Sequence, residues 1–269
     1  SCLGRCSLTV ALPVLSVMGV ECAVIPTAVL STHTIFPDFP CRDLTDELLP
    51  IARHWKSQQV HLDAIASGYL ASPRQTEAVC RVFDMLRGAD TLIVVDPAMA
   101  DHGRLYKPFA SDFPRYMKKV CTRAGVLLPN LTEACLLTDT PYREDPDEAF
   151  VQALLQKLSH LAPRVVLTGV SFDDDRLGAM SYDRTTGRYF AYYNEKVHAG
   201  FHGTGDIFTA TVLGAMMQGR TLEQAVTLAV DFTLECIRCT CADPAASWYG
   251  VEFEKALPWL ARQNNAGAE

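Results

Sequence analysis

The stretch HAGFHGTGDIFTATVLGAMMQG, residues 198–219, joins a polar, glycine-containing turn to an almost wholly apolar segment. A segment that is apolar on all sides is normally buried, so the pattern predicts a buried helix over 206–218. Gly219 follows it and suits the left-handed conformation in which many helices end. The stretch therefore predicts a core helix that begins directly after a glycine turn.

The turn itself consists of Gly203, Thr204, Gly205 and Asp206. Glycines allow backbone N–H groups to converge, and a helix N-terminus favours a bound anion. Asp206 is itself negative, so it would serve as a base beside the anion rather than as a ligand of it. A plain N-cap role for Asp206 stays open at this point, because Asp is a good N-cap residue.

The composition is that of a folded protein with a sizeable core. The chain has 269 residues, of which 49% are hydrophobic and 20% charged, and its net charge is -7. No basic stripe is present, so we expect no nucleic-acid partner. Residues 7–20 are uncharged, but this run is too short for a membrane span and is interrupted by Pro13. No basic segment of the kind that begins a signal peptide precedes it. We therefore expect a cytoplasmic protein without a membrane partner.

The cysteines are scattered, often within apolar runs, which is typical of small buried side chains in a reducing compartment. Cys236, Cys239 and Cys241 form a cluster, but no second Cys/His pair follows with zinc-finger spacing. We therefore expect no metal site there. The ten cysteines are Cys2, Cys6, Cys22, Cys41, Cys80, Cys121, Cys135, Cys236, Cys239 and Cys241.

Apolar, β-branched runs alternate with amphipathic helical patterns along most of the chain. This alternation predicts an α/β fold with a doubly wound, mostly parallel central sheet and helices on both faces. An antiparallel hairpin is expected near 177–197, and a second long helix from about 222, capped by Thr221 with Gln224. Strands are expected at 20–27, 59–70, 91–97, 124–130 and 164–170, and helices at 7–18, 43–58, 72–88, 112–124 and 145–162. The absence of repeats and linkers predicts a single domain over 1–269. The chain starts in a turn that leads into the helix expected at 7–18, and because such a turn and helix usually follow a strand, we expect a first strand upstream of Ser1.

Polar residues follow the predicted buried strands where each strand ends. Asp96 follows one strand, Asn130 and Glu133 follow the next, and Thr168 lies in the third. Ligands of open α/β sheets bind outside the carboxyl ends of the strands. Each residue alone is as well explained as a turn or cap, but together they resemble the parts of phosphoryl transfer: a phosphate cradle, carboxylates for magnesium and a carboxylate that orients the attacking hydroxyl. Walker-type and protein-kinase motifs are absent.

These motifs resemble those of the ribokinase superfamily. The resemblance is carried by GTGD (203–206), by DPAMADHGRLY (96–106) and by PNLTE (129–133), in the family's order and at strand ends. Within the superfamily the chain looks most like the pyridoxal/pyridoxamine kinases. LSTHT (30–34) is similar to their substrate loop, and SGYL (67–70) to the segment whose tyrosine packs on the pyridine ring.

The resemblance implies an enzyme that uses ATP and Mg²⁺, together with a monovalent cation such as K⁺, to phosphorylate the 5′-hydroxymethyl group of a B6 vitamer. It also implies a homodimer. The implied roles are a catalytic base for Asp206, an anion hole for Gly203, Thr204 and Gly205, metal binding for Glu133 and Asp96, ATP binding for Asp96, Glu133, Thr168 and Asn130, and substrate binding for Thr34, Tyr69, His33 and Asp206.

Two alternatives remain at the sequence level. A hydroxymethylpyrimidine kinase of thiamine synthesis would share the fold, but such enzymes typically carry Cys where this chain has Asp206. A non-catalytic nucleotide-binding protein would use the same cradle without a base. We also expect His202, beside the cradle, either to contact a ligand or simply to pack the turn.

Overall fold

The structure, a computed structural model, describes residues 1–266 and has the α/β architecture that the sequence predicts. The chain divides into two compact units. The first unit comprises residues 1–24, 28–42 and 192–269, and the second comprises 25–27 and 43–191.

The second unit is built on a six-stranded, mostly parallel sheet. Its strand order is β10-β9-β8-β7-β4-β3. Strands β3, β4, β7 and β8 pair in parallel, and β9 is antiparallel to β8. The strands are β3 (Ala64–Ser67), β4 (Leu92–Val95), β7 (Val126–Leu127), β8 (Arg164–Val170), β9 (Arg176–Asp183) and β10 (Arg188–Glu195). The last residues of β10 already belong to the first unit.

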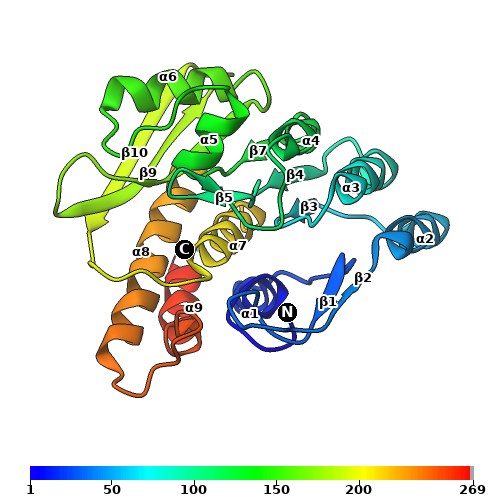
Figure 1. The fold of residues 1–269 in the computed structure, drawn as a ribbon, viewed down its shortest axis with the longest axis horizontal. Coiled ribbons are helices and arrows are strands. Elements are labelled where there is room, and N and C mark those ends of the chain that lie inside the picture. The colour runs from blue at the N-terminus through cyan, green and yellow to red at the C-terminus, as the bar shows by residue number, and fades with distance from the viewer. Residues whose placement is uncertain (267–269) are drawn as a thin grey trace. The chain divides into compact units, whose positions relative to one another are not determined.

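Helices fill the connections between these strands, as a doubly wound fold requires. They form a continuous row in which α2 packs on α3, α3 on α4, α4 on α5 and α5 on α6, as can be followed in Figure 1. The helices are α2 (Thr45–Ser57), α3 (Pro73–Leu86), α4 (Phe113–Cys121), α5 (Leu131–Leu137) and α6 (Glu148–Leu158). A short ribbon of β5 (Ala100–Asp101) and β6 (Arg104–Leu105) lies in the connection after β4.

The first unit is mainly helical, and α7 lies at its centre. The helix α7 (Thr204–Met217) packs on α1 (Leu8–Val17) and on α8 (Leu222–Ala242), while α9 (Leu257–Ala266) contacts α1 and the 3-10 turn η1 (Phe253–Lys255). Met18 Sδ lies 2.5 Å from where a Cβ at Gly214 would stand, so Gly214 permits the close packing of α1 on α7. The two-stranded sheet of β1 (Ala28–Leu30) and β2 (Cys41–Asp43) completes the unit.

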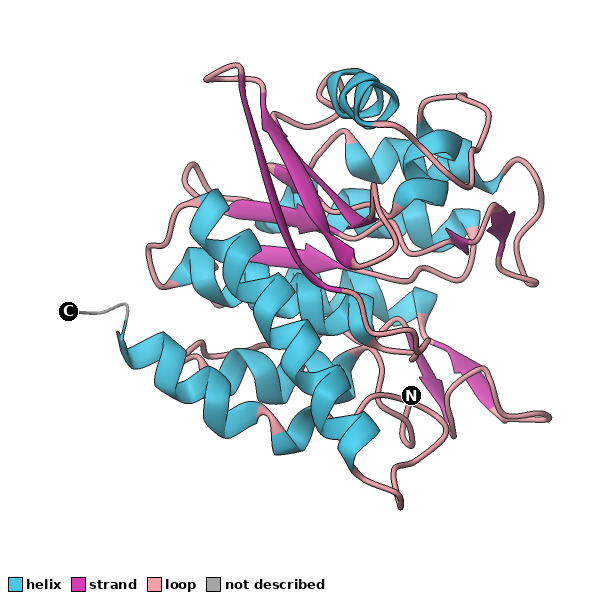
Figure 2. Ribbon diagram, turned by 90° about the vertical axis from the view of Figure 1, so that its left-hand side faces the viewer, coloured by secondary structure: helices cyan, strands magenta, loops and turns pink. Residues whose placement is uncertain are grey.

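Most of the predicted elements are confirmed. The buried runs 91–97, 124–130 and 164–170 contain β4, β7 and β8, and the hairpin predicted near 177–197 consists of β9 and β10, the two long strands in Figure 2. Thr221 and Gln224 form the expected capping box of α8. Gly219 has the expected positive φ, 80°.

The strand predicted at 20–27 is wrong. Residues 20–26 have no regular secondary structure, no strand of the described chain pairs with them, and pairing begins only at Ala28, in the small sheet with β2. An apolar, β-branched run shows that a segment can be extended and partly buried, but a ladder also needs a neighbour. Among residues 1–266, no helix is long and apolar enough to cross a membrane.

Candidate active site

The glycine turn at the start of α7 requires glycine at its first position. Gly203 has a left-handed φ of 90° and immediately precedes the helix. A Cβ at Gly203 would collide with the carbonyl oxygen of Arg5. At Gly205 the opposite holds, because nothing lies within 4 Å of the position of an added Cβ. The turn is therefore closely packed at Gly203 and open at Gly205, and the open side fits a bound anion.

Asp206 is the third residue of α7, inside its first turn, and Gly203 occupies the N-cap position. The plain N-cap interpretation of Asp206 is therefore wrong. Its carboxylate accepts a hydrogen bond from the backbone N–H of Ser7. Burial raises the pKa of Asp206, and the Ser7 bond partly opposes that shift because it favours the ionised form. The carboxylate is thus a desolvated, oriented base, which is what proton abstraction needs.

Ser7 itself has an unusual backbone conformation. It precedes α1 with a φ of 52°, which is uncommon for a residue other than glycine. Sparsely populated conformations persist where the surrounding structure enforces them, and they cluster at functional sites. At Ser7 this conformation accompanies the N–H bond to Asp206.

The loop that contains the predicted substrate residues His33 and Thr34 is fixed to the N-terminal segment. Leu3 N–H donates to the Ser31 carbonyl at 3.1 Å, and His33 N–H donates to the Leu3 carbonyl at 2.8 Å. Thr34 is exposed and therefore accessible to a ligand. The first unit thus holds this loop, the glycine turn and Asp206 together.

The His33 ring lies beside that of His202, with 5.2 Å between the centroids. His33 Nδ1 also accepts the N–H of Ile35 at 3.1 Å, which fixes the ring. Burial lowers the pKa of His33, and the neighbouring His202 lowers it further. Both effects favour a neutral imidazole that can accept or donate a hydrogen bond. His202 immediately precedes the glycine turn, so the pair links that turn to the substrate loop.

In the second unit, the polar residues predicted at strand ends do gather at one edge of the sheet. Asp96 directly follows β4, and its N–H donates to Ser67 at the end of β3, at 2.9 Å. Asn130 forms an isolated parallel bridge with Thr168. Asn130 Nδ2 also donates to the Ala100 carbonyl at 2.8 Å. Tyr69 lies after β3, and its ring is 5.4 Å from that of Phe109.

Glu133 is buried, and its carboxylate is largely occupied by backbone donors. Oε1 accepts the N–H groups of Met99 at 3.0 Å and Ala100 at 3.4 Å, and Oε2 accepts that of Asn130 at 2.9 Å. Burial, and after it the charge of Asp96, raise the pKa of Glu133 well above its usual value, although the three backbone hydrogen bonds lower it. The N-x-x-E pattern is thus also a capping box of α5, a structural signal that was readable in the sequence.

The fit of these residues to magnesium can be tested from their donors. A carboxylate can accept about four hydrogen bonds or metal contacts through its lone pairs. Three backbone N–H groups already bond to the carboxylate of Glu133. The residues that the structure describes contain no group of three or more His, Cys, Asp or Glu that could hold a metal. Mg²⁺ nevertheless suits one or two carboxylates when phosphates and waters provide its other ligands. Asp96 and Glu133 fit that mode.

Comparison with known proteins places the chain in a family. The profile of the phosphomethylpyrimidine kinases matches residues 15–246. The chain belongs to this family. As a phosphomethylpyrimidine kinase family member it is a phosphotransferase that acts on an alcohol group, as the sequence predicts. Of its relatives, the pyridoxal kinase of Arabidopsis thaliana is 28% identical over 243 residues, which are 87% of this chain and 78% of that protein.

Solved structures of the family have the same fold. A provisionally named phosphomethylpyrimidine kinase of Bacteroides thetaiotaomicron, crystallised with pyridoxal, is 39% identical with a TM-score of 0.91, covering 96% of this chain and 91% of that one. Pyridoxal kinase of Lactobacillus plantarum is 29% identical with a TM-score of 0.90, covering 100% and 96%. These likenesses confirm the predicted ribokinase-like fold class.

Proposed function

We propose that the chain transfers the γ-phosphoryl group of ATP to the 5′-hydroxymethyl group of a B6 vitamer, namely pyridoxal, pyridoxamine or pyridoxine. One observation carries the proposal above all. A desolvated carboxylate, Asp206, lies one residue after a glycine whose Cβ side is open, in a chain of a kinase family. That arrangement supplies a base next to a phosphate cradle.

The residues at the start of α7 act on the acceptor. Asp206 takes the proton of the acceptor hydroxyl while the backbone N–H groups of Gly203, Thr204 and Gly205 bind the transferring phosphoryl oxygens. In a loose transition state the attacking oxygen keeps its proton until late, so a carboxylate is a sufficient base. The amides need no reorganisation during the reaction because Gly203 is fixed against the Arg5 carbonyl.

The polar residues at the strand ends of the six-stranded sheet act on the nucleotide. Asp96 and Glu133 hold Mg²⁺, directly or through its waters, and Thr168 and Asn130 contact ATP. When bound, the ion neutralises charge on the phosphate oxygens. Three backbone N–H groups already bond to the Glu133 carboxylate, so Glu133 acts mainly through a metal-bound water.

The choice of a B6 vitamer rests on the relatives and on the substrate loop. Pyridoxal kinases are among the related proteins, and the 39% identical Bacteroides protein was crystallised with pyridoxal. Thr34 and His33 bind polar groups of the pyridine ring, and Tyr69 packs on its face. The requirement for K⁺, the homodimer and the cytoplasmic location stay predictions.

The family also supports hydroxymethylpyrimidine as an alternative acceptor. An ADP-release assay with pyridoxal, pyridoxamine, pyridoxine and hydroxymethylpyrimidine distinguishes the two functions. We expect at least one B6 vitamer to give the highest kcat/KM. A far higher kcat/KM for hydroxymethylpyrimidine would show that the acceptor is not a B6 vitamer. The absence of ADP release with all four compounds would refute the kinase function.

The same assay tests the base. Asp206→Asn should keep the fold and ATP binding but lower kcat by about 10² to 10⁴, the usual contribution of a general base. Glu223→Gln is the matched control, because Glu223 is an acid in the first turn of α8 and is placed in no site. If Asp206→Asn retains nearly full activity while Glu223→Gln does too, Asp206 is not the base.

A further inference from the structure

One short segment of the first unit, Arg5 to Ser7, contacts both groups that we assign to catalysis. The Arg5 carbonyl oxygen lies against Gly203, where an added Cβ would collide with it. Two residues later, the Ser7 N–H donates to the Asp206 carboxylate. Both contacts come from the main chain of this segment, so the position of the segment fixes the turn and the base together.

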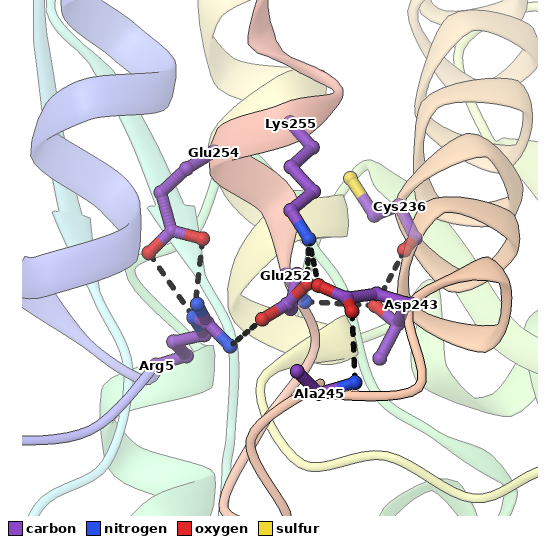
Figure 3. A network of polar contacts seen from close by, with 8 residues as sticks. Arg5, Cys236, Asp243, Ala245, Glu252, Glu254 and Lys255 are labelled. Carbon is purple, nitrogen blue, oxygen red and sulfur yellow. Dashed lines mark hydrogen bonds and ion pairs between the residues drawn. The ribbon is translucent and has the colours of Figure 1, made fainter.

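The Arg5 side chain anchors that segment. Its Nη1 lies 3.3 Å from Glu252 Oε1, and its Nε lies 3.1 Å from the Glu254 carboxylate, as Figure 3 shows. The Arg5 and Glu252 side chains are 17% and 7% exposed, whereas Glu254 is 51% exposed. Solvent screens an exposed pair strongly, so Glu252 is the more important partner. Gly250 allows this approach, since its Cβ would stand 2.8 Å from Arg5 Cβ.

Glu252 is in turn fixed to α8. Its N–H donates to Thr240 Oγ1 at 2.8 Å, and Thr240 Oγ1 donates to the Cys236 carbonyl at 2.7 Å. Lys255 bonds to Glu252 Oε2 at 2.6 Å and also pairs with Asp243. The neighbouring Val251 N–H donates to the His202 carbonyl at 3.3 Å, just before the glycine turn. Val251 and Glu252 therefore hold the glycine turn in two ways. Val251 bonds directly to His202, which precedes the turn, and Glu252 acts indirectly through Arg5.

We propose that Arg5, held by Glu252, is a positioning residue for phosphoryl transfer, which sets the glycine turn and Asp206 in their reactive geometry. This inference rests on the proposed function of those two groups. A displacement of about 1 Å at reacting groups can lower a rate by about 10²-fold. Substrate affinity changes less, because Arg5 contacts neither substrate in this scheme. The expected signature is a loss in kcat at nearly constant KM.

The test compares Arg5→Met with Arg5→Lys, Glu254→Gln and Arg123→Met, each assayed well below its own Tm. Arg5→Met should lower kcat by about 10- to 100-fold, with KM for ATP and for pyridoxal within about threefold of the wild type. Arg5→Lys, which keeps the charge but not the fork of donors, should recover part of the loss. Arg123→Met is the matched control, because it removes an arginine that pairs with Asp84 in the second unit and leaves the pairs of Arg5 intact. Arg123→Met and Glu254→Gln should keep kcat within about twofold.

A kcat of Arg5→Met within twofold of the wild type overturns the inference, as does an equal loss in Arg123→Met. If Arg5→Met does not fold, Glu252→Gln replaces it, with a loss of about tenfold expected and an unchanged kcat overturning the proposal. Hydrogen exchange at amides 203–206 supplies a readout that is independent of activity. Faster exchange there in Arg5→Met supports the positioning even if the wild type phosphorylates none of the acceptors, an outcome that refutes only the proposed function. Unchanged exchange counts against Arg5.

Discussion

Asp206 is partly buried, and burial raises the pKa of its carboxyl group, while the hydrogen bond from the backbone N–H of Ser7 opposes the shift. An acid whose pKa is higher in the folded state than in the unfolded state destabilises the fold once it ionises. The destabilisation begins as pH rises through the unfolded value, about 3.9 for Asp, and is complete above the folded pKa. At neutral pH the base therefore reduces the stability of the fold that carries it.

Asp206→Asn should accordingly raise Tm at pH 7.5, because the amide is neutral and its oxygen can still accept the Ser7 N–H. For a chain of this size, each kcal/mol recovered raises Tm by about 2–4 °C. The difference should shrink as pH falls and vanish well below the unfolded pKa of about 3.9, where the carboxyl is protonated in both states. Thermal melts across this pH range check the prediction. An Asn variant that melts below the wild type at pH 7.5 contradicts it.

Thr34, in the substrate loop, is exposed, and its hydroxyl forms no hydrogen bond to another described residue. Thr34→Val should raise KM for pyridoxal by about tenfold, the value of one hydrogen bond of about 1.4 kcal/mol, and leave KM for ATP nearly unchanged. Thr186→Val, in the turn between β9 and β10, is the control for loss of an exposed hydroxyl. Equal pyridoxal KM values for the two variants would remove Thr34 from the site.

At the scale of elements, the start of α7 separates packing from function. Gly203→Ala should destabilise the fold strongly, since Cβ would collide with the Arg5 carbonyl and φ is 90°. Gly205→Ala meets no neighbour and lies in the helix, where Ala is favoured over Gly by up to about 1 kcal/mol. Its methyl group, however, enters the open side of the turn.

Gly205→Ala should therefore keep or raise Tm while kcat falls by about tenfold or more, because the transferring phosphoryl group is displaced. Melting curves and steady-state kinetics on the same preparation provide both values. If Gly205→Ala is stable and fully active, the open side of the turn does not hold the phosphoryl group.

The capping box of α5 gives Glu133 two functions, one structural and one proposed for the metal. Glu133→Gln places an amide NH₂ among backbone N–H donors and should cost about 1–3 kcal/mol of unfolding free energy. It should also raise the magnesium concentration for half-maximal activity by about tenfold or more. Asp101→Asn, an exposed carboxylate in β5, is the control. An unchanged magnesium dependence in a folded Glu133→Gln protein would exclude Glu133 from the metal site.

For the whole molecule, local patterns predicted the elements, and they failed where the deciding group lies far along the chain. The run RVVLTGV became β8 with the predicted bounds, since its apolar, β-branched residues are buried between two neighbours. The run at 20–27 has a similar composition but no paired strand beside it in the described chain. The composition of a run indicates that the segment is apolar and favours a strand, but it does not indicate whether another strand lies beside it to form hydrogen bonds.

The candidate site shows the same limit. The glycines and Asp206 were recognisable because their residue types are themselves the signal. Arg5 and Ser7 were missed, because they act on residues about 200 positions away through a carbonyl and an N–H that every residue possesses. The one available hint was that Arg5 is the only Lys or Arg before Arg42.

The homodimer predicted from the family resemblance is a property of the whole molecule. Light scattering of the purified protein should give twice the monomer mass of 29.6 kDa. We expect the value to hold across the micromolar concentrations used for assays. A monomer mass throughout that range would contradict the prediction without affecting the proposed chemistry.

The first unit is assembled from both ends of the chain, residues 1–42 and 192–269 apart from 25–27, and this has a consequence for synthesis on the ribosome. Helix α1 leaves the exit tunnel about 200 residues before α7, its packing partner. At about 5–20 residues per second, α1 waits roughly 10–40 s for that partner. The second unit, nearly continuous, can fold during the wait. Arrested nascent chains in which residue 191 has just left the exit tunnel should therefore resist protease over 43–191 while residues 1–24 are still cleaved.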